Sequence, residues 1–204
     1  MLDVRVTFDA GSARDGATKG LASATNQLLV EGAGPYDADM FSVLLGRTGA
    51  ILENGTRRDM AFIGIRTLTE PDNLRASLDL LRLAVINPRF DENAVARVKA
   101  QTIIRMRVAS QQPGAIAEQE FYRQLYDGHP YSSPPDGEPE TVDQIERESL
   151  VSFHRSFYVS ENALISLVGG IDRAQAELIA EEISSGLAKG VAPPSLPSPK
   201  ESTV

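Results

Sequence analysis

Two histidines, His129 and His154, are the only imidazole groups in this sequence of 204 residues, which contains no cysteine. Imidazole is the commonest protein ligand for transition metals and a frequent general base near pH 7. His129 stands in a Gly-His-Pro-Tyr segment, where a hydrogen bond that stabilises the loop is a simpler role than metal binding or proton transfer. His154 follows Phe153 on an expected helix, where packing is the simpler role. Neither histidine has another close by in sequence, so neither defines a site by itself.

Short motifs for other chemistries are incomplete. Residues 11–19, GSARDGATK, lack the Gly-Lys-Ser/Thr of a phosphate-binding loop, and residues 31–36, EGAGPY, lack the third glycine of a dinucleotide-binding turn. The sequence has no Gly-x-Ser-x-Gly segment of the kind found in serine hydrolases. Asn54-Gly55-Thr56 matches a glycosylation acceptor, but Asn-Gly between apolar segments favours a hairpin turn. An enzyme with an unrelated active site is therefore the least favoured hypothesis.

The composition argues against two classes of partner. With 28 acidic and 20 basic residues the net charge is −8, which leaves no cationic surface for many phosphates, so we expect no nucleic-acid binding. No uninterrupted apolar run approaches the roughly 20 residues that span a bilayer, so we expect no membrane span. The first residues also lack the basic and apolar regions of a signal peptide. The lack of cysteine leaves the cellular compartment open.

Hydrophobic spacing predicts a mixture of strands and helices along the chain. Strands are expected over residues 2–8, 50–52, 60–68 and 164–168, and helices over residues 20–31, 40–45, 72–86, 91–110, 113–126, about 150–157 and about 172–187. The second and third strands should form an antiparallel hairpin around Asn54-Gly55. Residues 127–140 are rich in proline and glycine and predict a loop.

These elements predict an α+β fold with a single mixed, largely antiparallel sheet. We expect one face of this sheet to be covered by helices, namely those at 72–86, 91–110 and 113–126. Residues 1–188 form the expected domain, and the Pro/Ser-rich residues 189–204 an inter-domain linker with little to bury. Because the sequence begins inside a strand, we expect that the first strands of the domain belong to a longer protein.

A more specific pattern starts at Gly20. Residues 20–34, GLASATNQLLVEGAG, resemble the segment Gly-hydrophobic-Ala-His-x-x-Glu-His-Leu-Leu-x-x-Gly, which carries the zinc site of the pitrilysin, insulinase and mitochondrial processing peptidase family, the inverzincins. Further blocks of that family follow in the same order and extend the resemblance over about residues 2–187. They are Phe90-Asp91-Glu92, Gly128-His129-Pro130-Tyr131, Gly137-Glu138-Pro139-Glu140, Phe157-Tyr158, Asn162-Ala163 and Val168-Gly169. The resemblance implies the half-clam domain of processing peptidases.

The residues that carry zinc chemistry in that family are replaced here. Ser23 stands at the first histidine, Asn26 at the glutamate and Gln27 at the second histidine. The resemblance implies a further glutamate ligand about 75 residues downstream, near Ile104, where the sequence has no carboxylate. Hydroxyl and amide groups are weaker zinc ligands than imidazole or carboxylate. We therefore expect no catalytic residue, no metal ligand and no cofactor, and these four positions either line a chamber or form an ordinary polar helix face.

Family architecture implies a use for such a chain. In clam-shell particles of this family, a zinc-bearing half faces a homologous half without zinc, and the two enclose an unfolded peptide. We expect a non-catalytic subunit or domain of a processing-peptidase-like zinc protease, which forms a heterodimer with a zinc-bearing homologue or self-associates. The alternative is a structural scaffold or assembly protein of the same fold without peptide handling, as in respiratory-complex core subunits. By the same resemblance, the periplasm is slightly favoured over the cytoplasm.

Overall fold

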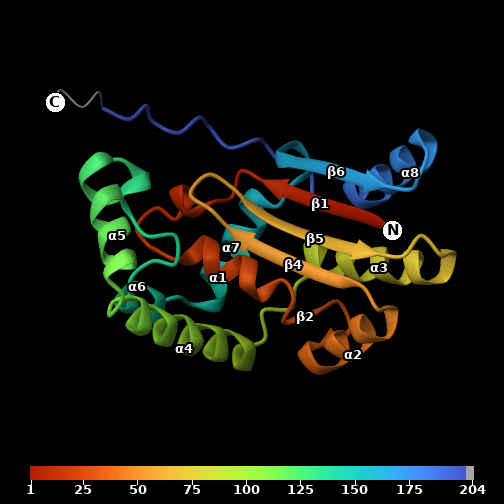
Figure 1. Cartoon of the computed structure of the whole chain (residues 1–204), viewed down its shortest axis with the longest axis horizontal. Helices are drawn as coiled ribbons and strands as arrows, with labels where there is room; N and C mark the ends of the chain where they lie inside the picture. The colour runs from red at the N-terminus through yellow and green to blue at the C-terminus, as the bar shows by residue number, and fades with distance from the viewer. Residues whose placement is uncertain (201–204) are drawn as a thin grey trace.

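The computed structural model describes residues 1–200 as an antiparallel sheet with helices packed beneath it (Figure 1). The four-stranded sheet has the order β4–β5–β1–β6. Its strands are β1 (Leu2–Phe8), β4 (Ile51–Thr56), β5 (Ala61–Thr67) and β6 (Ala163–Gly169), and a separate ribbon contains β2 (Gly32–Ala33) and β3 (Tyr36–Asp37). The α-helices are α1 (Leu21–Leu28), α2 (Ala38–Thr48), α3 (Pro71–Ile86), α4 (Glu92–Ala109), α5 (Pro113–Leu125), α6 (Pro139–Asp143), α7 (Arg147–Phe157) and α8 (Arg173–Ser185). Short 3-10 helices are η1 (Ser12–Arg14), η2 (Pro130–Ser132) and η3 (Ser160–Asn162). The predicted α+β fold is confirmed.

The central strand β1 fixes the two faces of the sheet. Its alternate residues are fully buried toward the helices, and they are Leu2, Val4, Val6 and Phe8. Val4 lies between Ile65 of β5 and Leu167 of β6, so the inward residues of three strands share one row. Shifting this register by one residue would turn every apolar side chain of β1 to the opposite face. Burial of one face therefore specifies the pairing.

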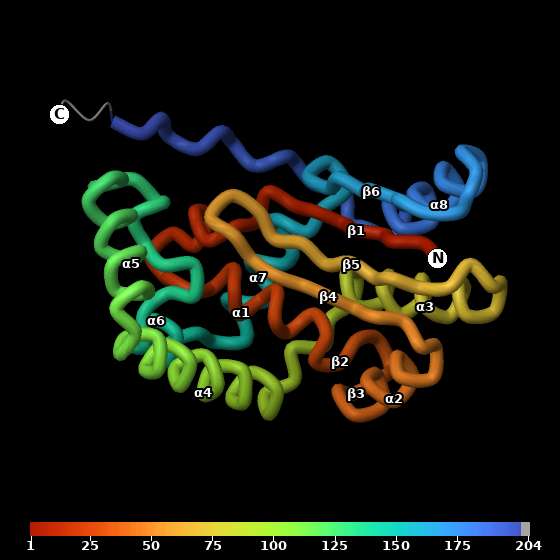
Figure 2. The backbone as a smooth tube through the Cα atoms, in the orientation of Figure 1, coloured from red at the N-terminus to blue at the C-terminus, as the bar shows by residue number. Residues whose placement is uncertain are grey.

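Three helices contact the sheet directly, and one of them is α8, which lies against β6 at the edge. α1 lies against β4 and β5, α3 lies against β5, and α7 packs on α1. α4 packs against α1 and α6 and not mainly on the sheet, and α5 buries no residue. The tube in Figure 2 shows α5 at the end of the sheet where the β4–β5 hairpin turns. Of the three helices expected on the sheet, α3 takes that place, while α1 occupies the room expected for α4 and α5.

The predicted turn at Asn54-Gly55 is wrong. β4 continues through both residues, which pair with β5, and the chain reverses at residues 57–60. Asn54 remains in the strand, where its side chain donates to the backbone carbonyl of Asn26 at 2.7 Å. This tertiary hydrogen bond outweighs the local turn preference of Asn-Gly. The hairpin itself is therefore present, with its turn four residues later than predicted.

Smaller differences occur elsewhere in the described residues. The expected loop 127–140 contains η2 and the first residues of α6, a helix that hydrophobic spacing does not reveal because it is one turn long. Asp172 caps α8 as the start signal predicts, since its carboxylate accepts from the Gln175 N–H at 2.8 Å. Across residues 1–200, no helix is both long and apolar enough to cross a bilayer.

A buried carboxylate fixes the start of α1. Asp15 is 4% exposed, and its two oxygens accept from the backbone N–H groups of Gly20 and Ala22, both at 2.7 Å. These N–H groups belong to the helix start, where no intrahelical acceptor exists. Burial raises the pKa of Asp15 to about 7, because desolvation of the charged carboxylate outweighs the two hydrogen bonds and the nearby Lys19.

Replacing Leu81 with alanine should destabilise the domain strongly. Leu81 is completely buried on α3, so Leu81→Ala removes apolar contacts and leaves a cavity, at a cost of about 2–5 kcal/mol in the free energy of unfolding. Leu178→Ala on α8, where the side chain is 67% exposed, is the matched control and should change stability by less than about 0.5 kcal/mol. Urea denaturation measures both, and equal losses would contradict the placement of the core.

The stability of the domain should depend on the ionisation of Asp15. Between its ordinary pKa of 3.8 and the folded value of about 7, the folded chain binds a proton that the unfolded chain has released. The free energy of unfolding therefore falls as pH rises through this window and levels off above it, by on the order of a few kcal/mol. The wild-type protein should show this fall relative to Asp15→Asn, which cannot ionise and keeps one acceptor oxygen.

Denaturant unfolding at pH 5, 6, 7 and 8 provides the measurement. Asp172→Asn, at the exposed cap of α8, is the matched control and should retain the wild-type pH dependence because Asp15 is intact. A constant difference between wild type and Asp15→Asn over the whole range would refute the raised pKa.

Candidate functional site

The helix that carries the motif positions begins at a close contact between two backbones. Gly20, at the start of α1, has φ +92°, and a Cβ atom there would lie 2.5 Å from the carbonyl oxygen of Asp136. A Cβ atom on Gly137, which has φ +83°, would lie 2.4 Å from the Lys19 carbonyl oxygen. Only glycine fits both the backbone conformation and the space at these positions. The two glycines thus bring the carboxylate of Asp136 over the first turn of α1.

Ser23 and Gln27 form a hydrogen-bonded chain between two opposite charges. The Ser23 hydroxyl donates to Asp136 Oδ1 at 2.7 Å, and Gln27 Nε2 donates to Ser23 Oγ at 3.1 Å. At the other end, Arg105 Nη2 of α4 donates to Gln27 Oε1 at 2.8 Å. Every polar group in the chain has a partner, and the neutral side chains connect a carboxylate to a guanidinium.

The contact from α4 comes from the residue after Ile104. The Ile104 side chain is 58% exposed, whereas Arg105 reaches Gln27 and also donates to the Thr102 hydroxyl at 2.9 Å. Thr102 is buried on the inward face of α4. The structure therefore brings Ser23 and Gln27 together with Arg105, and Ile104 takes no part in the hydrogen bonds.

Asn26 points to the other side of α1 and ties the helix to the sheet. Its Nδ2 donates to the Phe62 carbonyl of β5 at 3.0 Å and lies 3.4 Å from the Tyr158 hydroxyl. Asn54 of β4 donates to the Asn26 side-chain oxygen at 3.1 Å. Burial raises the pKa of Tyr158, because the charged phenolate would be desolvated, so this hydroxyl stays protonated. Asn26 is thus a completely buried structural amide.

Both histidines have the structural roles expected for them. His129 Nδ1 accepts from the Tyr131 N–H at 3.1 Å, and its Nε2 donates to the Pro197 carbonyl oxygen at 2.8 Å. His154 Nε2 lies 2.8 Å from the Val85 carbonyl, and its ring stacks on Tyr158. Burial lowers the pKa of His154 and favours its neutral form.

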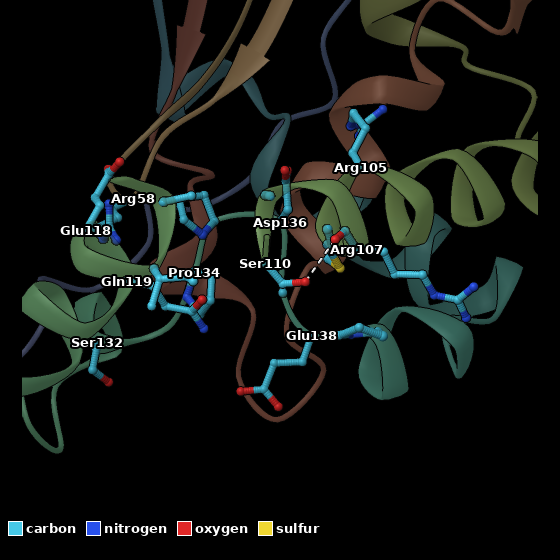
Figure 3. Close-up of a pocket in the computed structure, with 17 residues that line it drawn as sticks. Arg58, Arg105, Arg107, Ser110, Glu118, Gln119, Ser132, Pro134, Asp136 and Glu138 are labelled. Carbon is cyan, nitrogen blue, oxygen red and sulfur yellow. Dashed lines mark hydrogen bonds between the residues drawn. The ribbon is translucent and has the colours of Figure 1, made fainter. Parts of the chain in front are cut away.

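A groove of about 510 Å³ opens beside this network (Figure 3). It lies between α4, α5 and the loop that precedes α6. Figure 3 shows Asp136 between Arg58 and Glu118 on one side and Arg105 and Arg107 on the other. The groove joins both ends of the hydrogen-bonded chain, since Asp136 and Arg105 both line it. Sequence reasoning missed these two residues because only the fold brings the loop and α4 to α1.

The side chains at the motif positions do not suit a zinc ion. Zinc sites in proteins use imidazole, thiolate or carboxylate ligands, while Ser23 and Gln27 offer a hydroxyl and an amide oxygen. The cationic side chain of Arg105 donates to Gln27 Oε1, the amide oxygen that would have to face the metal. Among residues 1–200 no three His, Cys, Asp or Glu side chains gather as a metal-binding group. What the arrangement can do is hold α1, α4 and the loop together and present a groove lined by both charged and apolar residues.

Comparisons with known proteins agree with this fold. Residues 2–135 match the family described as insulinase (peptidase family M16), and residues 144–204 match the family described as peptidase M16 inactive domain. An uncharacterized zinc protease of Mycobacterium leprae is 25% identical over 189 residues, which are 92% of this chain and 42% of that protein.

Solved structures give the same result. The crystal structure of a peptidase M16 inactive domain from Pseudomonas fluorescens is 34% identical, with a TM-score of 0.95 over 98% of this chain and 48% of that one. A chain of complex III2 from Candida albicans is 20% identical, with a TM-score of 0.74 over 97% of this chain and 44% of that one, and shows the fold alone. The chain thus spans less than half the length of these relatives. Because the insulinase match extends over residues 2–135, well over half of the sequence, this protein belongs to the insulinase family of peptidases, family M16.

Proposed function

We propose that this chain is a non-catalytic domain of an M16 peptidase assembly and pairs with a zinc-bearing homologous domain to form a peptide-binding chamber. The observation that carries the proposal is the contact between Arg105 and Gln27, because it places a fixed positive charge where the family resemblance implies a dication. The relative of known structure with 34% identity is described as an inactive domain of the same family, which supports this assignment.

The charge of Arg105 opposes metal binding in addition to the loss of a ligand at that place. A guanidinium is a cation at physiological pH, and at 2.8 Å from Gln27 Oε1 it already engages the one oxygen that Gln27 could offer to a metal. A divalent cation beside it would meet like charge at close range, and this Coulomb repulsion disfavours metal binding at Gln27. In this proposal, Arg105 stands in the place of the downstream ligand, and the motif has become a structural network.

Pairing with a partner would cover an exposed surface on α4 and α5. The outward sides of α4 and α5 carry apolar side chains that are more than half exposed, and they are Ile104, Val108, Ile116 and Phe121. In this proposal, these exposed apolar side chains meet the partner. A groove with both carboxylates and guanidinium groups lies next to it and would suit an extended peptide with polar side chains.

The second candidate function is a structural one. Complex III2 from Candida albicans contains a chain of the same fold, so this fold also occurs in an assembly that is not described as a protease. In that case the domain would associate with other subunits and handle no peptide. The two functions differ in whether peptide cleavage by a zinc-bearing partner depends on this chain.

Restoring zinc should require removal of the guanidinium. We expect Ser23→His with Gln27→His to bind zinc poorly, because Arg105 still faces position 27. Adding Arg105→Glu removes the cation and supplies a third ligand, so zinc affinity should rise by at least about 100-fold. Asn26 is left unchanged because it is bonded to Phe62 and Tyr158. Competition with a chelator of known affinity measures the dissociation constants.

The control is Arg107→Glu in the same histidine background. It makes the same charge change two residues further along α4. Zinc affinity should then stay near that of the double-histidine variant. If both glutamate variants bind zinc equally well, net charge and not the position of Arg105 decides affinity, and the assignment of Arg105 to the ligand place fails.

Peptide cleavage should require both partners. We expect the full-length protein to form a heterodimer with a zinc-bearing homologue, and cleavage of an unstructured peptide to rise with added protein until the two are equimolar. Size-exclusion chromatography and a fluorogenic peptide assay at varied ratios measure the complex and the rate. If the zinc-bearing protein alone is as fast as the mixture and no complex elutes, the chamber proposal is refuted in favour of the scaffold function.

A further inference from the structure

The proline-rich end of the described chain lies along the domain in a regular way. Residues 189–200 contain no helix or strand, and Figure 1 shows them as an extended segment that leaves the region of β6 toward the α5 end. Along residues 190–200, every third residue up to Leu196 is partly buried, namely Gly190, Pro193 and Leu196, and the others are exposed. A burial period of three is typical of a polyproline-II helix, which has three residues per turn and no internal hydrogen bonds.

The hydrogen bonds that hold the segment have the same period. Arg14 Nη1 donates to the Pro194 carbonyl at 2.7 Å, and His129 Nε2 donates to the Pro197 carbonyl at 2.8 Å. In a polyproline-II helix, carbonyls three residues apart face the same side. Both donors can therefore bind one face of the segment without bending it.

The start of the segment is fixed as well. The Ser160 N–H donates to the Ala188 carbonyl at 3.0 Å, and the Gly190 N–H donates to Glu161 Oε2 at 2.8 Å. A Cβ atom on Gly190 would lie 2.7 Å from the Val159 side chain, so glycine permits this close approach. The segment is anchored at both ends and not only where it leaves the domain.

The anchors on the domain are themselves held in place. Arg14 forms a two-point ion pair with Asp9, with contacts of 2.8 and 2.5 Å, so its guanidinium is oriented before it meets the segment. His129 is buried, and its ring packs edge-on against Tyr131 with 4.5 Å between the ring centroids. Tyr131 and Leu164 line a hollow of about 430 Å³ together with Leu196.

We infer that residues 188–197 form a polyproline-II strap that docks on η1 and η2, and that this strap, unlike a flexible tether, fixes the point at which the following chain leaves the domain. Proline-rich segments suit such docking because they lose little conformational entropy when they bind. η1 leads to Asp15 at the start of α1, and η2 leads to Asp136, so the strap ends beside the groove. The inference concerns this chain alone and does not depend on any partner.

The magnitude of the effect makes the strap testable. A free flexible segment of ten residues has a root-mean-square end-to-end distance of roughly 17 Å, with an orientation that varies from molecule to molecule. A strap anchored at Pro197 leaves residue 198 only one residue from a fixed point, within about 4 Å. The distribution of distances from the domain to residue 198 should therefore be narrow if the strap is docked and broad if it is free.

Pulsed electron–electron double resonance between two spin labels measures that distribution of distances. The chain has no cysteine, so labels on Ala76→Cys, exposed on α3, and Ser198→Cys attach nowhere else. We expect a narrow distribution for the full chain. Replacing Pro193, Pro194 and Pro197 with glycine keeps every carbonyl but removes the stiffness, and should at least double the width.

Two further variants separate docking from stiffness alone. Pro199→Gly lies beyond the last anchor and is the matched control, with no change expected in the width. Arg14→Gln removes a donor on the domain side and should broaden the distribution while the strap sequence is intact. A wild-type distribution as broad as that of the triple-glycine variant would overturn the inference, as would an unchanged width in Arg14→Gln.

Discussion

The burial of α1 is the constraint on which the rest of the structure depends. Seven of its eight residues are buried, including the polar residues Ser23, Thr25 and Asn26. A polar group removed from water must find a partner or cost about 1–3 kcal/mol. Each partner therefore comes from a different element: Asn26 bonds to β5, Ser23 to the loop before α6, and Thr25 to its own helix at Leu21. The hydrogen bonds that satisfy the polar side chains of this short helix thus position the sheet, the loop before α6 and, through Gln27, α4 around it.

The same constraint explains how the fold accommodates polar side chains at positions 23 and 27. Apolar residues there would remove the partners of Asp136 and Arg105, at a cost in free energy for the part-buried carboxylate of Asp136. Ser23 and Gln27 avoid this cost because they link the carboxylate to the guanidinium through two neutral side chains. Removing one partner from such a network is more expensive than replacing the whole network. The network therefore helps to maintain the shape of the groove.

Local patterns predicted most of the fold, and tertiary contacts account for what they missed. Alternation in β1 and the cap at Asp172 act within a few residues, so the sequence reveals them. The turn at Asn54-Gly55 failed because Asn54 is held by a residue 28 positions away. The sequence did not reveal the roles of Arg105 and Asp136 for the same reason, because 78 and 113 positions separate them from their partners Gln27 and Ser23. The family resemblance placed the downstream position near Ile104, one residue before Arg105, which makes the contact with Gln27.

In the proposed function the domain acts by holding other chains in place, so the stiffness of its connections matters. Association costs several kcal/mol in lost translational and rotational freedom, and a flexible connection recovers only part of it. A docked strap lowers this cost further, because the direction in which the chain continues is already chosen in the free domain. Arg14 lies on η1, which leads into α1, and His129 lies beside η2, which leads to Asp136, the partner of Ser23 on α1. The contacts that stabilise the start of α1 and the contacts that orient the strap therefore involve the same loops. A substitution that shifts one set of contacts should also shift the other.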